Sequence, residues 1–164
     1  MTLQQHLGIE LPIIQAPMAG IQTSAMAIAV SNAGGLGSLP AAMLTLDVLR
    51  HELTTIRAQT DKPFNVNFFC HSPTAPDTAR EAAWRDLLAP YYREHGIDAN
   101  SIAQGLGRMP FNTDVCDVVE PFAPPVVSFH FGLPNAELLA RVRGWGAKVL
   151  CSATTVEEGQ WLQD

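Results

Sequence analysis

The residues best suited to chemistry stand in or at the ends of apolar segments that are typical of buried β-strands. Gln15 ends one segment, Asn65 and Asn67 alternate along another, and His130 closes a third. In α/β folds, ligands bind at the carboxyl ends of parallel strands. We therefore expect these side chains to meet at one mouth of a parallel sheet.

The amides and the imidazole fit different parts of a ligand. Asn65 and Asn67 point to the same face of their strand, because strand side chains repeat every two residues. An amide both donates and accepts hydrogen bonds, which suits a heterocycle edge such as the flavin pyrimidine; alternatively, Asn67 satisfies neighbouring backbone groups in the core. His130 could bind an anion or relay a proton, or it could be a satisfied core histidine.

A corner of small residues follows the first apolar segment, over residues 13–20. Ala16, Pro17 and Gly20 leave the backbone open to a flat ligand such as a flavin ring. The simpler interpretation is an ordinary tight turn between a strand and a helix.

Strand-like and helix-like segments alternate along the chain, which predicts βα units and a parallel sheet. Capping residues and glycine stops predict helices after Thr23 or Ser24, after Thr45 and after Asn135. A further capping box is expected at residues 154–157, where a fifth helix starts. We predict five strands, at residues 12–15, 35–39, 64–69, 126–131 and 147–151.

The alternation of strands and helices is interrupted over residues 71–125, where we expect a long helical and loop excursion in place of a single helix. Thr78 to Glu81 has the pattern of a capping box. The helix that follows carries an apolar stripe, which we interpret as core: Trp84, Leu87, Leu88 and Tyr91. We expect a loop over residues 100–112 and a short helix over 114–119.

Composition excludes several classes of function. Charged residues make up only 16% of the 164 residues and the formal charge is −6, so nucleic acid and anionic membranes are not expected partners. Three cysteines without a CxxC pair favour the cytoplasm over a disulfide framework. No apolar run approaches the ~20 residues of a membrane helix, and no secretory leader is visible.

Three familiar kinds of site are not predicted. Cysteines and histidines show no metal-ligand spacing, and no Gly-x-Ser-x-Gly elbow occurs. Gly35-x-Gly37 lacks the third glycine of a dinucleotide fingerprint. We interpret these glycines as a helix stop and a strand whose backbone closely approaches another group.

Five segments together resemble the nitronate monooxygenases of the bacterial class I type, formerly called 2-nitropropane dioxygenases. They are residues 12–18, 31–38, 61–67, 127–132 and 151–155. The resemblance covers essentially the whole chain and implies a flavin-binding TIM barrel. The fold class predicted is thus α/β, a partial (β/α)8 barrel of about five sequential units, forming a single incomplete domain over residues 1–164.

The resemblance also implies a reaction and a site. FMN-dependent oxidation of alkyl nitronates, such as propionate 3-nitronate, with O2 would give a carbonyl compound and nitrite. Gln15, Ala16, Pro17, Met18 and Asn67 are expected to bind the flavin. His130 is expected in the substrate cavity, and no metal is implied.

This chain departs from the family pattern in what it lacks. The family's proposed catalytic histidine lies in a Gly-Gly-His-Arg-Gly stretch, and its phosphate-binding glycine loops come later still; neither occurs here. We expect a truncated enzyme, inactive alone, whose catalytic residue lies beyond Asp164. Its open sheet edges would pair with the missing C-terminal half or with another copy.

Two alternatives remain from the sequence. The enoyl-acyl carrier protein reductases share the opening motif and would use NAD(P)H as reductant. A flavodoxin-like binding module could also be built from five parallel strands, but its strand order would be shuffled rather than sequential.

Overall fold

The computed structural model describes residues 1–73, 75, 77–102 and 109–163. These residues form two compact units. The first contains Met1–His71 and residues 109–163, and the second contains the described residues of Ser72–Gly107. Each unit is described separately below.

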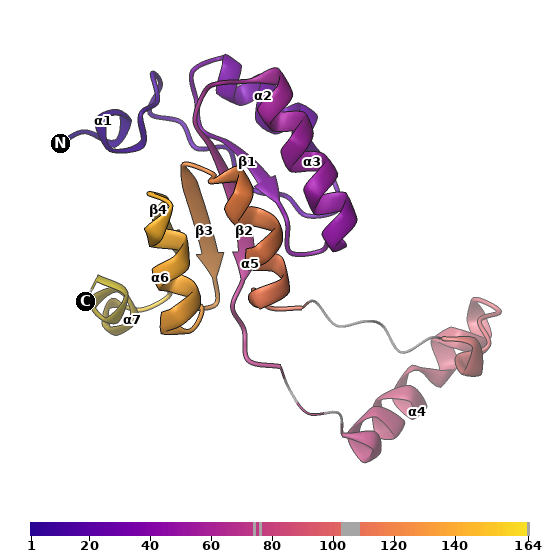
Figure 1. Ribbon diagram of the computed structural model, residues 1–164. Coiled ribbons are helices and arrows are strands. Elements are labelled where there is room, and N and C mark those ends of the chain that lie inside the picture. The colour runs from indigo at the N-terminus through magenta and orange to yellow at the C-terminus, as the bar shows by residue number, and fades with distance from the viewer. Residues whose placement is uncertain (74, 76, 103–108, 164) are drawn as a thin grey trace. The chain divides into compact units, whose positions relative to one another are not determined.

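The first unit is built on a parallel sheet of four strands in sequential order (Figure 1). The strands are β1 Gly37–Pro40, β2 Phe64–Phe69, β3 Val126–His130 and β4 Lys148–Cys151. Each strand pairs in parallel with the next along the chain. This order excludes the shuffled sheet of a flavodoxin-like module and agrees with the predicted barrel segment.

The strand predicted at residues 12–15 forms only an isolated parallel bridge, between Ile14 and Leu36. Two backbone hydrogen bonds of 2.9 Å hold it, from Gln15 N to Leu36 O and from Leu36 N to Ile13 O. The segment lies beside β1 as expected, but the prediction of a full strand was wrong. The pairing stops at Ala16 and Pro17, where the chain turns and proline offers no N–H.

The predicted helix starts are largely confirmed, because capping is a local property. Thr23, Thr45 and Asn135 accept hydrogen bonds from the first turns of their helices. An additional short helix, α1, was not predicted and starts with a Thr2–Gln5 capping box. The helices of this unit are α1 Leu3–Leu7, α2 Ser24–Asn32, α3 Leu46–Gln59, α5 Thr113–Val119, the 3-10 turn η2 Glu120–Phe122, α6 Ala136–Gly144 and α7 Val156–Gln163.

The last helix begins one residue later than predicted. Thr155, rather than Thr154, accepts the hydrogen bond from the amide of Glu158, at 3.1 Å. The Glu158 carboxylate in turn accepts hydrogen bonds from the backbone and the hydroxyl of Thr154. The capping chemistry was therefore correct and its register was shifted by one residue.

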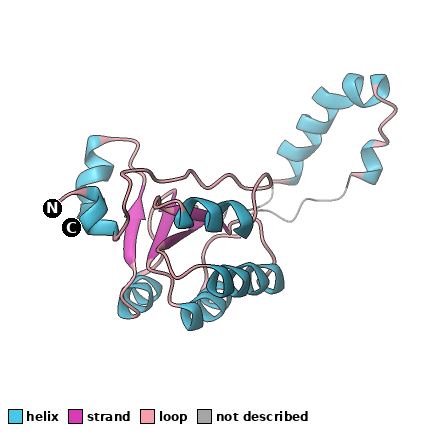
Figure 2. Ribbon diagram, turned by 90° about the horizontal axis from the view of Figure 1, so that it is seen from above, coloured by secondary structure: helices cyan, strands magenta, loops and turns pink. Residues whose placement is uncertain are grey.

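One face of the sheet, the helix face, carries the main apolar core. Helices α2, α3, α5 and α6 each contribute buried side chains to it, and most helices of this unit gather along one side of the strands (Figure 2). The strand residues of this face are fully or almost fully buried: Leu39, Phe64, Val66, Phe68, Val127 and Phe129. At roughly 1.5–3 kcal/mol for each large apolar side chain, this burial is the principal stabilisation of the sheet.

Helix α2 lies directly against the backbone of β1. A Cβ atom at Gly37 would overlap the main-chain carbonyl of Ala27, and α2 makes many contacts with β1. The predicted close approach of this glycine-rich strand is therefore confirmed, and its partner is a helix of the same unit.

The second unit contains helix α4 Thr78–Glu94 and the 3-10 turn η1 Ala99–Ser101. Asp77, not Thr78, caps α4, by accepting a hydrogen bond of 3.0 Å from Arg80 N. A hydrogen bond of 2.9 Å from Arg85 Nη1 to Ala99 O ties the two elements together. Of the loop predicted at residues 100–112, residues 100 and 101 fall on η1, residues 102 and 109–112 lie outside helices and strands, and residues 103–108 lie outside the described residues.

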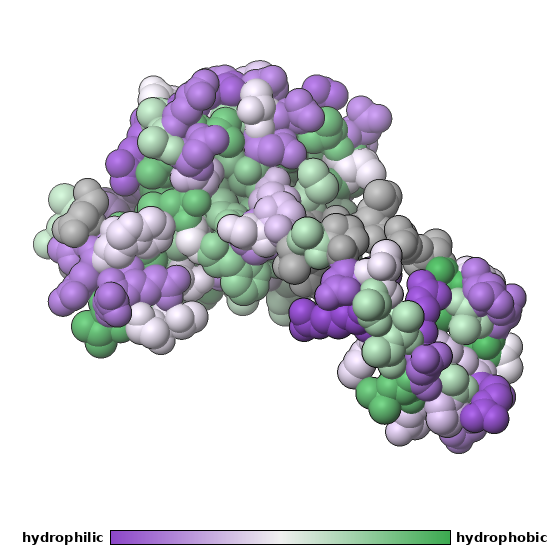
Figure 3. All heavy atoms as spheres, turned by 90° about the horizontal axis from the view of Figure 1, so that it is seen from below, coloured by the Kyte–Doolittle hydropathy of each residue, from purple (hydrophilic) through white to green (hydrophobic). Residues whose placement is uncertain are grey.

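The apolar stripe of α4 is not a core. Within the described residues, α4 buries none of its side chains, and Trp84, Leu87 and Tyr91 are 58–61% exposed. The helical spacing was right, but this unit brings no sheet or long helix against the stripe. Figure 3 shows apolar side chains, in green, on the surface of this unit.

Candidate functional site

The opposite face of the sheet, the cavity face, is also buried, and it carries a group of polar side chains next to a smaller apolar cluster that includes Val126. Ser38 on β1, Asn65 and Asn67 on β2 and Ser128 on β3 are each at most 8% exposed. The parallel register sets Ser38 beside Asn65, and Asn67 beside Ser128. Their period of two places all four on the face away from the main core.

These four side chains form one hydrogen-bond network. Asn65 Nδ2 donates to Ser38 Oγ at 3.1 Å and to Ser128 Oγ at 2.9 Å. Asn67 Nδ2 donates to the same Ser128 Oγ at 2.9 Å and to Ser128 O at 3.3 Å. Ser128 thus joins the two amides, and the polar groups of three strands are satisfied mainly by one another.

One atom of the network is left over. Asn65 Oδ1 is buried and has no hydrogen-bond partner among the described residues. An unsatisfied buried acceptor costs about 1–3 kcal/mol. A ligand that brings an N–H donor to this oxygen would recover that energy. The network is therefore suited to bind a hydrogen-bond donor at Asn65 Oδ1.

The first segment is fastened to β1 by two glutamines. Gln15 Oε1 accepts a hydrogen bond from Ser38 N at 2.9 Å, and Gln15 Nε2 donates to Ala16 O and, at 2.7 Å, to Gln22 Oε1. Gln22 Nε2 donates to Ser38 O at 2.5 Å. In this structure the Gln15 amide is therefore engaged in positioning the corner, while Ala16 and Met18 of that corner are exposed.

His130 lies at the carboxyl end of β3, as predicted. Its Nδ1 lies 2.5 Å from the hydroxyl oxygen of Ser152, just beyond β4. The ring also approaches Phe69 and Phe131, with centroid separations of 6.2 Å to each. Within the described part of the chain, Nε2 is the ring nitrogen that remains for a ligand.

A cavity of about 170 Å³ brings three parts of the predicted site together. Its lining includes Ile14 and Pro17 from the first segment, Asn65, Ser128 and His130 from the cavity face, and Leu150, Cys151 and Ser152 from the end of β4. Of the residues singled out from the sequence, Pro17, Asn65 and His130 line it directly. Asn67 reaches it through Ser128, and Gln15, Ala16 and Met18 lie on the neighbouring corner.

Three serines of this site were not predicted as functional residues from the sequence: Ser38, Ser128 and Ser152. A signal existed for Ser128, because it stands two residues before His130 and must share its face. No such signal existed for Ser38 or Ser152. Their places depend on strand register and on the turn after β4.

The cavity combines polar and apolar lining residues. Ile14, Phe129 and Leu150 line it together with Asn65, Ser128 and His130. Three further apolar side chains are exposed in the turns that follow the first segment, β1 and β3: Ile21 at 81%, Met43 at 54% and Phe131 at 63%. A cavity that joins apolar walls to a few polar groups suits a flat heteroaromatic ligand.

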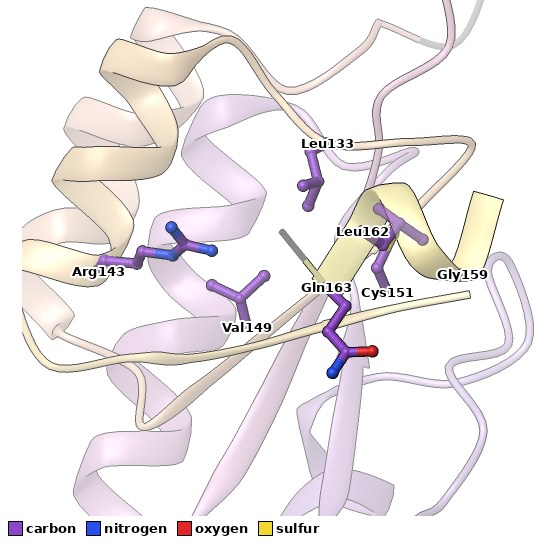
Figure 4. Close-up of a pocket in the computed structure, with 7 residues that line it drawn as sticks. All are labelled: Leu133, Arg143, Val149, Cys151, Gly159, Leu162 and Gln163. Atoms are coloured by element: carbon purple, nitrogen blue, oxygen red, sulfur yellow. The ribbon is translucent and has the colours of Figure 1, made fainter. Parts of the chain in front are cut away.

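A second cavity, of about 240 Å³, lies between β4, α6 and α7 (Figure 4). Arg143 and Gln163 bring polar groups to it, and Leu133, Val149 and Leu162 bring apolar ones. It belongs to the helix side of β4, and Cys151 lines both cavities. Its lining contains none of the predicted flavin-binding or substrate-cavity residues.

The three cysteine thiols are not activated as nucleophiles. All three are free. Burial raises the pKa of Cys70 to about 12 and raises the pKa of Cys116 and Cys151 as well, so the reactive thiolate is disfavoured at neutral pH. Among the described residues, no cluster of His, Cys, Asp and Glu could hold a metal ion, and no helix could cross a membrane.

Comparison with known proteins agrees with this architecture. The sequence profile described as "Nitronate monooxygenase" matches residues 1–164. The chain belongs to the nitronate monooxygenase family. The nitronate monooxygenase of Paraburkholderia phytofirmans is 44% identical over 162 residues, which are 96% of this chain and 43% of that protein. The Pseudomonas aeruginosa nitronate monooxygenase is 44% identical over 159 residues, 96% of this chain and 45% of that protein.

Solved structures extend the comparison to the fold. A nitroalkane oxidase from Streptomyces ansochromogenes superposes with a TM-score of 0.83 at 34% identity, over 99% of this chain and 45% of that one. FabK from Thermotoga maritima superposes with a TM-score of 0.68 at 27% identity, over 98% of this chain and 40% of that one. The chain therefore spans less than half the length of these relatives, and its sheet is part of an α/β barrel.

Proposed function

We propose that residues 1–164 contribute the first βα units of a single flavin-binding barrel domain that oxidises alkyl nitronates, such as propionate 3-nitronate, with O2. The products would be a carbonyl compound and nitrite. The observation that carries this proposal is the cavity of the cavity face, where Pro17, Asn65 and His130 converge in a chain that matches the family over its whole length.

The residues of this cavity fit a flavin. The unpartnered Asn65 Oδ1 is an acceptor for a ring N–H, and the corner formed by the exposed Ala16 and Met18 and the half-buried Pro17 offers backbone groups to a flat ring. Gln15 holds that corner in place through Ser38, and Asn67 fixes the orientation of Ser128. FMN, when bound, would supply the electron acceptor for the nitronate.

His130 is the group that we assign to the substrate. Because Nδ1 faces Ser152, Nε2 can hydrogen-bond to an anionic nitronate oxygen above the floor of the cavity. Ser152 therefore acts as a positioning residue that fixes the ring. The apolar lining residues Ile14, Phe129 and Leu150 would exclude water from this contact and strengthen it.

The two edges of the sheet indicate where further strands would pair. β4 is an outer strand of the described sheet, and each of its residues is only half-buried. At the other side, the first segment lies against β1 through the bridge between Ile14 and Leu36. We propose that β4 and the outer side of this first segment pair with further barrel strands, supplied by the remaining half of such a barrel or by another copy. The chain's three free cysteines support a reducing, cytoplasmic setting.

The test is complementation. The 164-residue chain is produced alone, and together with a segment comprising the C-terminal half of the Paraburkholderia relative. We expect the pair, and not the single chain, to copurify with FMN and to release nitrite from propionate 3-nitronate. A copurified pair that binds no flavin, or that binds flavin without oxidising any nitronate, would contradict the proposal.

Two controls make the result specific. His130→Ala in the same pair should retain FMN and lose most nitrite release, because the variant removes the group assigned to the substrate. NADH is added without a nitronate as the second control. Rapid bleaching of the flavin by NADH would favour the enoyl-acyl carrier protein reductase reaction instead.

A further inference from the structure

Phe131 has a backbone conformation that phenylalanine rarely adopts. Its φ is +66°, in the left-handed region where a Cβ atom is strained and where glycine is usual. Gly132, which follows, also has a positive φ of +99°. A bulky residue in such a position points to a role for its side chain, since strained residues are concentrated at ligand sites.

The ring of Phe131 is exposed and yet belongs to a cluster. It is 63% exposed, but it packs edge-on against Phe69 with a centroid separation of 5.1 Å. It also lies 6.4 Å from His71 and 6.2 Å from His130. We call Phe69, His71 and Phe131 the aromatic wall.

The wall lies beside the cavity that holds the candidate substrate group. Phe69 and His130 are register partners at the carboxyl ends of β2 and β3, so the wall and the imidazole share the same end of the sheet. His130 itself lines the cavity. A ligand whose anionic end reaches His130 therefore has an apolar aromatic surface next to it.

We propose that the aromatic wall binds the alkyl chain of the nitronate while His130 binds its charged end. The inference rests on the proposed function and adds the surface that binds the alkyl chain, so that the affinity for a straight-chain nitronate rises with chain length. Phe131 is then a substrate-binding residue, and its unusual backbone is what turns its ring toward the mouth instead of into the core.

The experiment measures binding to the 164-residue chain, without flavin or turnover. The probes are the 1-nitronates of ethane, propane, butane and pentane, and the method is saturation-transfer difference NMR with irradiation of the aromatic protons. In the wild type we expect transfer to the terminal methyl group, and a Kd that falls by up to about fourfold with each added methylene.

The matched variants are Phe131→Gly, Phe131→Leu and Phe131→Ala. Glycine accepts the positive φ without strain, so Phe131→Gly should be more stable than Phe131→Ala while lacking the ring. Phe131→Gly should lose the dependence on chain length, and Phe131→Leu should retain part of it. A residue with a merely structural role would change the unfolding midpoint and leave the chain-length dependence intact.

The outcomes separate this inference from the proposed function. If Phe131→Gly folds and binds every nitronate as the wild type does, or if wild-type affinity does not depend on chain length, the aromatic wall is refuted. If the chain-length dependence is present and lost in Phe131→Gly, the wall is supported even when the complemented enzyme releases no nitrite. Binding that depends on Phe131 in an enzyme that releases no nitrite would refute the proposed oxidation reaction and leave the aromatic wall intact.

Discussion

The two faces of the sheet are buried to a similar degree, but they are filled by different chemistry. On β2, Phe64, Val66 and Phe68 pack against helices, while Asn65 and Asn67 on the same strand face a network of serines. All five are at most 2% exposed. The helix face is satisfied by apolar packing, whereas the cavity face retains one unsatisfied acceptor.

This contrast indicates that the helix face mainly stabilises the fold, whereas the cavity face is suited to bind a ligand. Apolar burial on the helix face requires no ligand and no particular hydrogen-bond geometry. The cavity face requires partners for each amide, and it leaves Asn65 Oδ1 for a group from outside the described residues. The comparison predicts that mutations on the helix face affect folding most, and that those on the cavity face have smaller effects on it.

The largest effect is expected where α2 touches β1. Gly37→Ala would place a methyl group on the Ala27 carbonyl, and a backbone atom cannot move aside without moving the helix. We expect a loss of at least about 3 kcal/mol in the free energy of unfolding, measured by urea denaturation. Gly144→Ala is the control, because a Cβ there meets no atom within 4 Å; equal stability of the two variants would contradict this close approach.

The next largest effect is expected in the centre of the helix face. Phe129 is completely buried and packs on Phe68 and Phe111 with ring centroids 6.4 Å and 5.3 Å away. Phe129→Ala should lower the free energy of unfolding by about 3–5 kcal/mol. Val156→Ala, at a residue 81% exposed, should change it by less than about 0.5 kcal/mol.

A smaller effect is expected on the cavity face. Ser128→Ala removes the hydroxyl that accepts from both Asn65 and Asn67, but each amide keeps a second acceptor. We expect a loss of about 1–3 kcal/mol in the same denaturation experiment, with Ser152→Ala as the exposed control. A loss as large as that of Phe129→Ala would remove the distinction between the two faces.

The smallest effect concerns Cys70, which packs against the helix-face core. Burial raises the pKa of its thiol from an ordinary value of 9.0 to about 12, so the folded state holds the proton more tightly than the unfolded state. The stability due to this neutral thiol is complete below pH 9 and is lost as the pH rises toward 12.

Cys70→Ala isolates that contribution. The difference in stability between the wild type and this variant should shrink as the pH rises above 9, and iodoacetamide should label Cys70 at pH 8 only after unfolding. Rapid labelling of Cys70 in the folded wild type would show that its thiol is not held in the neutral form.

Local features were predictable from the sequence because their causes are local. The caps at Thr23, Thr45 and Asn135 are confirmed, since each is decided by one side chain and the next few amides. The caps predicted at Thr78 and Thr154 were each wrong by one residue, because Asp77 and Thr155 beside them can also cap. The strand at residues 12–15 was overestimated because pairing depends on the partner strand as well as on the segment itself.

The prediction that the apolar stripe of α4 belongs to a core was wrong for a different reason. Helical periodicity establishes that Trp84, Leu87 and Tyr91 share a face, but it does not establish what covers that face. In the described part of the second unit nothing does. The placement of Gln15, Ala16, Met18 and Asn67 against a flavin likewise stays a prediction, because it needs a ligand to test it.

Sequence alone was enough to predict the alternation of strands and helices, most of their caps, the polar period of β2 and the motifs that mark the family. These features depend on residue types and on neighbours in the chain. Three arrangements could be known only from the folded chain: Ser38 and Ser128 meet Asn65, Ser152 contacts His130, and Phe131 exposes its ring at a positive φ. Those arrangements depend on strand register and on packing between distant segments, which no local pattern encodes.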